Sequence, residues 1–359
     1  MSSTFKNIDV EIYGESHAPE IGVVIKNLPE NESVDLGELQ LFLNRRKGVN
    51  KAWSTQRIED DKIEILSGLE CGKTTNKELQ ACIKNSNVKS GDYSSISGKP
   101  RPSHADYAAY LKNSGPVPIP GGGKFSGRMT APMCIAGGIA KQILEKDGIQ
   151  IHAYVKSIGF STAAGYMDKD VRVVNFDDVY SYTIPNLDGQ KAADDMTMAI
   201  EMARAGKDSV GGVIECVVLN MTPGIGDALY DGLEGRIAQS VYAIPAVKGV
   251  EFGAGFAFAN MYGSDANDPF IVKDGKIETK TNNAGGINGG ISNGMPICLR
   301  VAFRPTPSIA QKQNSVDVET KQETTIEIQG RHDSCIVPRA IPVVEAAVAL
   351  ALLDAKLDK

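Results

Sequence analysis

GGGKFSGRMTAPM, residues 121–133, is the stretch around which the chain is organised. Its three consecutive glycines have no side chains to pack and are poor material for a helix or a strand. Such a backbone can approach a ligand closely and offer its N–H groups to an anion. A lone GGG is more often an ordinary turn, so the neighbouring segments must decide between the two interpretations. RPSHAD, residues 101–106, precedes it, and an apolar segment that predicts a helix over residues 131–146 follows it.

The composition favours a globular chain that handles a small ligand. With 359 residues, of which 42% are hydrophobic, the chain can bury a sizeable core as one large domain or two. The net charge of −6 argues against a whole-surface attraction to nucleic acid or to anionic lipid. Any anionic ligand must therefore be held by a local basic cluster.

Cysteine usage and the N-terminal residues predict a cytoplasmic protein. The six cysteines are scattered without a CxxC pair, which is typical of reduced thiols in the cytosol. Residues 1–14 lack the basic-then-apolar pattern of a signal peptide. No apolar run approaches the ~20 residues of a membrane span. We expect a soluble protein with neither a membrane nor a nucleic-acid partner.

Periodicity and turn residues predict a mixture of helices and strands. Strands are expected at residues 7–13, 21–27, 62–66, 149–158, 213–219, 248–259 and 296–304, and helices at 35–46, 76–85, 131–146, 191–205, 226–242 and 343–357. Residues 282–294, NNAGGINGGISNG, predict a compact irregular loop. Because the elements do not alternate regularly as βαβ units, the pattern favours an α+β fold.

A GKT triplet at residues 72–74 resembles part of a phosphate-binding P-loop. It follows a predicted strand and precedes a predicted helix, which is the context that this motif needs. The spacing fails, however, because the motif requires a glycine five residues before Gly72, where Ser67 stands. Nucleotide hydrolysis is therefore disfavoured.

A basic cluster, Arg45-Arg46-Lys47, closes the helix predicted over residues 35–46. Cations suit the C-terminal end of a helix dipole, and this alone would explain one or two of them. Three in a row, followed by Lys51 and Arg57, also fit an anion site. Both interpretations remain open at this point.

Three of the four histidines lie in polar, glycine-rich blocks: His17 in GESHAPE, His104 in RPSHAD and His332 in GRHDSC. The same blocks and their neighbours contain Arg101, Arg128, Arg331, Asp106 and Asp333. Histidine exchanges protons near neutral pH, and arginine binds phosphate and carboxylate in a bidentate manner. This combination indicates acid–base chemistry on a highly anionic small substrate. No spacing of histidine, cysteine and carboxylate residues indicates a metal site, so no metal is expected.

Taken in order, these blocks resemble the chorismate synthase family. GESHAPEIGVVI, the RR cluster, TQR…KIEILSG, GDYS, RPSHADY, GGGKFSGR, GKDSVGG, AVKGVEFGAGF, NNAGGINGGISNG and GRHDSCIVPRAIPVVEA stand in that family's order, from residue 14 to about residue 350. The resemblance implies a helical layer between two antiparallel β-sheets, a single domain over residues 1–359 and a homotetramer.

The resemblance also implies a reaction. It would be a lyase of the shikimate pathway, which leads to the aromatic amino acids. The expected chemistry is the 1,4-elimination of phosphate from 5-enolpyruvylshikimate 3-phosphate to give chorismate, with reduced FMN as an obligatory cofactor and no net redox change. The chain has no recognisable flavin-reductase module, so we expect reduced FMN to come from elsewhere, and not from NADPH through this chain.

The family's site residues carry over by position. The resemblance implies that His17, with Ser16 beside it, protonates the departing phosphate. His104 would protonate the reduced flavin with Ser126 as a relay, and Asp333 would assist the hydrogen abstraction. The substrate anions would be held by Arg45, Arg46, Arg57, Arg101 and Arg128. The flavin would be held by Lys124, Phe125, Ser126, Pro245, Ala246, Gly289, Arg304, Pro305, Thr306, Pro307, Ser308 and Arg331.

The chain departs from the family pattern at several of these positions. Lys124-Phe125 stands where the family usually has Arg-Ser, Met129 replaces a glutamate, Pro245 an asparagine and Ser103 a glycine. The alternative hypothesis is therefore a homologue that binds flavin or an anionic ligand without catalysis. The joint presence of Ser16, His17, His104, Ser126 and Asp333 favours the enzyme, since a binding protein needs no pair of histidines.

Overall fold

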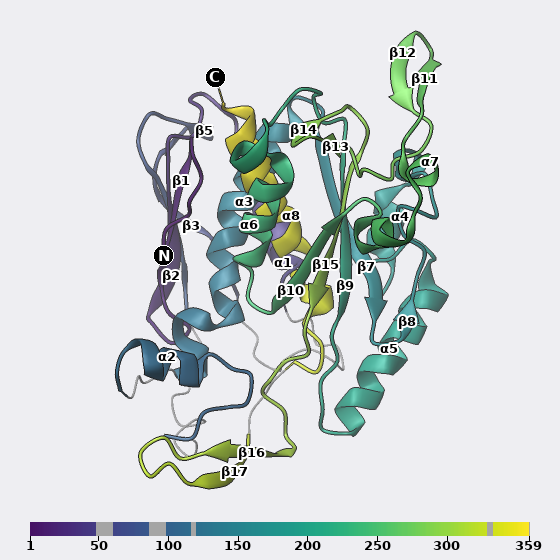
Figure 1. Ribbon diagram of the computed structural model, residues 1–359. Helices are drawn as coiled ribbons and strands as arrows, with labels where there is room; N and C mark the ends of the chain where they lie inside the picture. The colour runs from purple at the N-terminus through teal and green to yellow at the C-terminus, as the bar shows by residue number, and fades with distance from the viewer. Residues whose placement is uncertain (48–59, 86–97, 116–119, 329–332, 359) are drawn as a thin grey trace.

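Two antiparallel β-sheets enclose a layer of helices (Figure 1). The computed structural model describes residues 1–47, 60–85, 98–115, 120–328 and 333–358. The first sheet has the order β1-β2-β6-β3 and the second the order β10-β15-β9-β7-β8. The first is built from β1 (Asp9–Gly14), β2 (Glu20–Lys26), β6 (Leu79–Lys84) and β3 (Glu64–Ser67). The second is built from β10 (Val247–Phe252), β15 (Ile297–Phe303), β9 (Gly212–Leu219), β7 (Gln150–Ile158) and β8 (Ser161–Thr162).

The helical layer contains the two most buried helices of the described chain. It comprises α1 (Leu36–Asn44), α3 (Thr130–Glu145), α6 (Leu233–Tyr242) and α8 (Val337–Lys356). The outer helices are α2 (Asp106–Lys112), α4 (Phe176–Ser181), α5 (Gln190–Ala205) and α7 (Gly263–Ala266). Short two-stranded ribbons pair β4 (Leu69–Glu70) with β5 (Lys73–Thr74), β11 (Phe270–Lys273) with β12 (Lys276–Thr279), β13 (Ile287–Asn288) with β14 (Ile291–Ser292), and β16 (Lys312–Val316) with β17 (Glu323–Glu327). The expected α+β class, with helices between antiparallel sheets, is confirmed.

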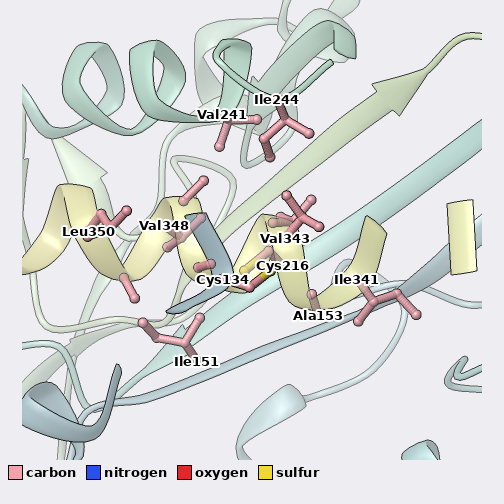
Figure 2. Close-up of a cluster of buried hydrophobic side chains, with 14 of the residues drawn as sticks. Cys134, Ile151, Ala153, Cys216, Val241, Ile244, Ile341, Val343, Val348 and Leu350 are labelled. Carbon is pink, nitrogen blue, oxygen red and sulfur yellow. The ribbon is translucent and has the colours of Figure 1, made fainter. Parts of the chain in front are cut away.

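Helices α3 and α8 pack closely because α3 carries a glycine where they meet. A Cβ added to Gly137 would lie 2.3 Å from the Cβ of Ala346, so only glycine allows this approach. Figure 2 shows Val343 and Val348 of α8 among apolar side chains from α6, β7 and β9. One continuous apolar cluster therefore joins both sheets through the helical layer. In the part of the chain that the structure describes, no helix is both long and apolar enough to cross a membrane.

Helix α1 is capped by Asp35, the first residue of the range predicted for this helix. The Asp35 side chain accepts hydrogen bonds from the backbone N–H groups of Gly37 (2.7 Å) and Glu38 (3.0 Å), which satisfies the first turn. The backbone N–H of Asp35 donates to Gln142 of α3 at 2.8 Å. The N-terminus of α1 is thus tied to α3 by this bond.

The helix predicted over residues 76–85 is wrong, because this segment is strand β6. Leu79, Ala81 and Ile83 are each at most 1% exposed and face the core with a period of two. The strand pairs with both β2 and β3, and this long-range pairing overrides the local helical preference. Because a strand follows the GKT triplet, the helix that a P-loop needs is absent there.

Other element boundaries differ from the predictions in smaller ways. Helix α6 begins at Leu233, and the residues before it form a 3-10 turn, Leu229–Asp231. Helix α8 begins six residues before the predicted start and runs through Pro342. Strand β10 ends at Phe252 and is followed by a 3-10 turn, Gly255–Asn260. The loop predicted over residues 282–294 contains the small β13–β14 hairpin.

Asp354, near the end of α8, holds the segment that leads into β1. Its carboxylate is 2% exposed and accepts the backbone N–H groups of Asn7 at 2.6 Å, Ile8 at 3.1 Å and Lys6 at 3.2 Å. Three donors satisfy this buried carboxylate, which would otherwise be costly to remove from water. The first sheet and the helical layer are therefore joined by a polar contact as well as by apolar packing.

Candidate active site

His104 lies just before α2 in a small charged network. Its Nδ1 atom is 2.6 Å from Oδ1 of Asp106, and Arg101 donates to the same carboxylate from Nε at 2.7 Å and from Nη2 at 2.8 Å. Burial raises the pKa of Asp106, but Arg101 and His104 outweigh burial and hold it well below its usual range. Nδ1 also lies 3.0 Å from Nη2 of Arg101, which can only donate, but that nitrogen already donates to Asp106. The shorter contact of Nδ1 is with the carboxylate, which can only accept, and it favours a proton on Nδ1. The atom of His104 left for proton exchange is Nε2.

The glycine triplet lies directly against this imidazole. It forms a 3-10 turn, Pro120–Phe125, in which Gly122 has φ +95°. A Cβ added to Gly122 would be 3.6 Å from His104 Nε2 and 3.4 Å from the Cβ of Ser126. The carbonyl of Gly123 accepts the backbone N–H of Ser16 at 3.4 Å. The turn therefore brings together three sequence blocks that contain Ser16, His104 and Ser126.

Ser126 starts the short 3-10 turn that leads into α3. Its hydroxyl accepts the backbone N–H of Arg128 at 3.2 Å, which caps the turn Gly127–Met129. This cap places Ser126 beside the glycine triplet and Arg128 one residue into the turn. Two of the residues implied by the family resemblance are thus positioned by one local motif.

Arg46 and Arg128 are buried side by side around one carboxylate. Arg46 is 5% exposed and Arg128 8% exposed, and Asp61 contacts both guanidinium groups. Burial, and then the neighbouring Arg339, lowers the pKa of Arg46 to about 10. This pKa is still well above neutrality, so Arg46 keeps its charge and this part of the site suits an anion.

Arg45, the third expected substrate-binding arginine in this region, lies in a different environment. Its Nη1 and Nη2 atoms each donate to the buried Glu345 at 2.8 Å, and its guanidinium carbon lies 4.4 Å from the ring centre of Tyr180. Burial lowers the pKa of Arg45, but Glu345 outweighs burial and raises it. Both terminal nitrogens of Arg45 are therefore occupied within the chain.

The segment after β15 joins the RPSHAD block. Arg304 donates from Nη1 to the carbonyl of Ser103 at 2.5 Å, and Arg101 donates to the Ser308 hydroxyl at 3.4 Å. The backbone N–H of Arg304 donates to the carbonyl of Ala246 at 3.0 Å, which connects Pro245-Ala246 to the same region. Most of the expected flavin-binding residues thus lie on segments that contact the block containing His104, including Pro305, Thr306 and Pro307 between Arg304 and Ser308.

Asp333 lies beside the N-terminal turn of α8. Arg339 donates from Nη1 to the Asp333 carboxylate and from Nε to the carbonyl of Arg46 at 3.1 Å. Arg339 thus links the expected catalytic carboxylate to the arginine pair. Arg339 was not predicted as a site residue, although an arginine beside an apolar helical segment is a usable signal.

Two carboxylates of the site had no role assigned from the sequence: Asp106 was noted only as part of its polar block, and Asp61 was not singled out. Asp106 follows His104 by two residues, and that spacing was the available signal for an imidazole partner. Asp61 lies between a predicted basic cluster and a predicted strand, with no motif of its own. Its role follows only from the arginines that surround it.

Some expected site residues are not brought to the glycine turn. Gly289 lies between β13 and β14, at the end of the molecule opposite to α2 (Figure 1). Lys124 and Phe125, by contrast, belong to the glycine turn itself, and the Lys124 ammonium lies 5.5 Å from the ring centre of Phe125. Arg57 and Arg331 lie outside the residues that the structure describes.

Comparisons with known proteins agree with the fold and identify a family. The family model of chorismate synthase matches residues 8–357. Chorismate synthase from Korarchaeum cryptofilum is 45% identical over 342 residues, which are 95% of this chain and 93% of that protein. The enzyme from Thermococcus kodakarensis is 44% identical over 349 residues, covering 97% and 96% of the two chains. A crystal structure of chorismate synthase covers 99% of this chain and 93% of its own, with 28% identity and a TM-score of 0.75.

The fold and the family match thus define a lyase with a mixed α+β architecture. The chain belongs to the chorismate synthase family. It is an enzyme of the shikimate pathway, which serves aromatic biosynthesis, and the resemblance seen in the sequence is confirmed.

Proposed function

We propose that the enzyme converts 5-enolpyruvylshikimate 3-phosphate to chorismate by 1,4-elimination of phosphate, with reduced FMN as its cofactor. The observation that carries this proposal is the close approach of Gly122 to both Ser126 and Nε2 of His104. A proton-exchanging atom, a hydroxyl and an open backbone turn meet at one place, with the buried guanidinium group of Arg128 on the following turn. Elimination from a highly anionic substrate requires such groups, to transfer protons and to bind negative charge.

The residues expected to hold the flavin fit that group chemically. The Thr306 hydroxyl is buried and has no hydrogen-bond partner among the described residues, and Ala246 has φ +76°, a conformation that turns its backbone out of regular pairing. The run Arg304–Ser308, Ser126, Pro245-Ala246 and Lys124-Phe125 would hold FMN. Bound reduced FMN would supply electron density that assists the loss of phosphate, without net oxidation of the substrate.

The chain's own residues would manage protons and charge. His104 would exchange a proton at Nε2 while Asp106 fixes its orientation, and Ser126 would relay that proton. His17, beside Ser16, would protonate the departing phosphate, and Asp333 would assist the removal of hydrogen. Arg46, Arg101 and Arg128 would hold the phosphate and the carboxylates of the substrate. At an effective dielectric constant near 20, one charge pair at about 4 Å contributes about 4 kcal/mol before desolvation, so a few arginines outweigh the mildly negative whole chain.

The expectations about location, assembly and partners belong to the same proposal. We propose a cytoplasmic homotetramer with one domain per chain, no metal, no membrane or nucleic-acid partner and an external source of reduced flavin. Arg45, Arg57, Arg331 and Gly289 remain predicted ligand-binding residues. Gly289 would reach a flavin only if another copy of the chain brings its β13–β14 hairpin to the site.

The decisive experiment is an anaerobic assay with the pure substrate and dithionite-reduced FMN. Chorismate formation, followed by its absorbance, would support the proposal, and flavin binding without turnover would favour the non-catalytic alternative. Repeating the assay with NADPH and oxidised FMN tests the external reductant, since robust turnover there would overturn that part. His104→Ala should slow turnover with pre-reduced FMN, and an unchanged rate would remove His104 from the mechanism.

A further inference from the structure

Asp61 is a buried carboxylate between the two arginines of the candidate site. It is 3% exposed and accepts a hydrogen bond from Arg128 Nη1 at Oδ1. Its other oxygen, Oδ2, lies 3.6 Å from Arg46 Nη1. One carboxylate is thus shared by two guanidinium groups, and the group of three carries a net charge of +1.

The backbone at Asp61 is held in a specific conformation. Asp61 has φ +45°, which side-chain-bearing residues adopt infrequently. Its carbonyl accepts the Gln40 side-chain amide at 3.0 Å, and the same Gln40 side chain accepts the backbone N–H of Ile63 at 3.0 Å. Helix α1 therefore fixes where the Asp61 carboxylate lies.

The remaining donors of the two arginines are mostly occupied. Arg46 donates from Nε to the Thr130 hydroxyl and from Nη2 to the carbonyl of Gly127, both at 2.7 Å. Arg128 donates from Nε to Asn85 at 3.0 Å. Arg128 Nη2 is buried and, among the described residues, has no hydrogen-bond partner. Such an atom marks the place where an anion oxygen would complete the set of hydrogen bonds.

We propose that Asp61 is a positioning residue that holds Arg46 and Arg128 as one unit, leaves Arg128 Nη2 to the substrate anion and limits the charge of the pair to +1. The proposal rests on the proposed function, in which these arginines hold the substrate. A fully uncompensated pair would attract phosphate more strongly but would be less ordered, since two guanidinium groups repel one another. Asp61 thus lowers the affinity for phosphate and keeps the two guanidinium groups oriented.

The first test is Asp61→Asn, which removes the charge and keeps the shape. With reduced FMN under anaerobic conditions, kcat should fall at least tenfold, because Arg46 then faces an amide. In an isothermal titration with inorganic phosphate, affinity should increase at least threefold, because the pair then carries +2. A purely structural role would not strengthen phosphate binding. Unchanged or weaker phosphate binding, or a kcat within twofold of the wild type, overturns the proposal.

Asp61→Glu separates charge from position and decides the question if the Asn variant does not fold. It should bind phosphate within twofold of the wild type, while kcat falls at least threefold. Stronger phosphate binding or an unchanged kcat would contradict the assignment. If wild-type enzyme fails to turn over the substrate, the proposed function fails, while the phosphate titrations still test the shared charge.

Discussion

Glu345 of α8 accepts one hydrogen bond from each terminal nitrogen of Arg45, both at 2.8 Å. The carboxylate is fully buried and also accepts the Tyr180 hydroxyl and the backbone N–H of Ala153, each at 3.0 Å. Burial raises the pKa of Glu345, but Arg45 and then Lys141 outweigh burial and lower it to about 2. A charged glutamate therefore sits inside the helical layer at neutral pH, and the basic cluster of the sequence has a structural task as well as an expected ligand-binding one.

Arg45→Met should destabilise the fold. Breaking a buried ion pair costs about 3 kcal/mol or more, and Lys141 at 3.4 Å keeps the loss near the lower value. Urea unfolding at pH 7 measures the change in the free energy of unfolding. Lys191→Met, at an exposed position of α5, is the matched control and should change it by less than about 0.5 kcal/mol. Equal stability of the two variants would argue against a structural role for Arg45.

Asp106→Asn should reduce kcat roughly 10- to 100-fold, because an amide no longer fixes the Nδ1–H tautomer of His104. The measurement is anaerobic turnover with dithionite-reduced FMN. In a His104→Ala background the same change should add little, since residues that act together are not additive. Asp274→Asn, at an exposed turn, serves as the control. Fully additive losses would show that Asp106 acts independently of His104.

Gly137→Ala should destabilise the enzyme by about 3 kcal/mol, because the new methyl group would overlap Ala346 and push α3 and α8 apart. Gly235→Ala, in α6, is a control of opposite sign. No heavy atom lies within 4 Å of a Cβ added there, so the better helix former should stabilise by about 0.5–1 kcal/mol. Thermal and urea unfolding of both variants check the pair, and a stable Gly137→Ala protein would refute close packing of the two helices.

His152 should make stability depend on pH below neutrality. Burial, followed by Lys141, lowers its pKa from 6.5 to about 4, and its ring stacks on Phe176 at 3.9 Å. The unfolded chain binds a proton at this imidazole more readily than the folded chain does. The contribution of neutral His152 to the free energy of unfolding is therefore complete above about pH 6.5 and is lost as pH falls toward 4. The slope is about 1 kcal/mol per pH unit. His152→Asn should flatten the stability profile in that window, and parallel profiles for variant and wild type would exclude the effect.

Much of the fold follows from local patterns, and the failures have a common cause. Strands β1 and β2 and helices α1, α3 and α5 lie close to their predicted ranges, since caps and periodicity are encoded locally. The helix predicted over residues 76–85 was wrong because the strand conformation of this segment depends on pairing with β2, some sixty residues away. Local preference alone cannot show that pairing.

In the candidate site, too, compact motifs could be predicted from the sequence and long-range partners could not. The histidine and glycine blocks were identified because each is a compact motif, and the structure brings the blocks of His104, Ser126 and Ser16 together. Partners distant in sequence were not predictable: Arg45 and Glu345 are 300 residues apart. Asp61 has no motif and gains its meaning only from Arg46 and Arg128.

The bonds from Asp354 to the backbone of residues 6–8 also determine when synthesis can yield a finished protein. Because 346 residues separate Ile8 from Asp354, the first sheet cannot acquire this contact until Asp354 has left the ribosome. The strands of the first sheet must therefore wait for α8. A nascent chain that stalls before α8 would leave the apolar inner face of that sheet uncovered.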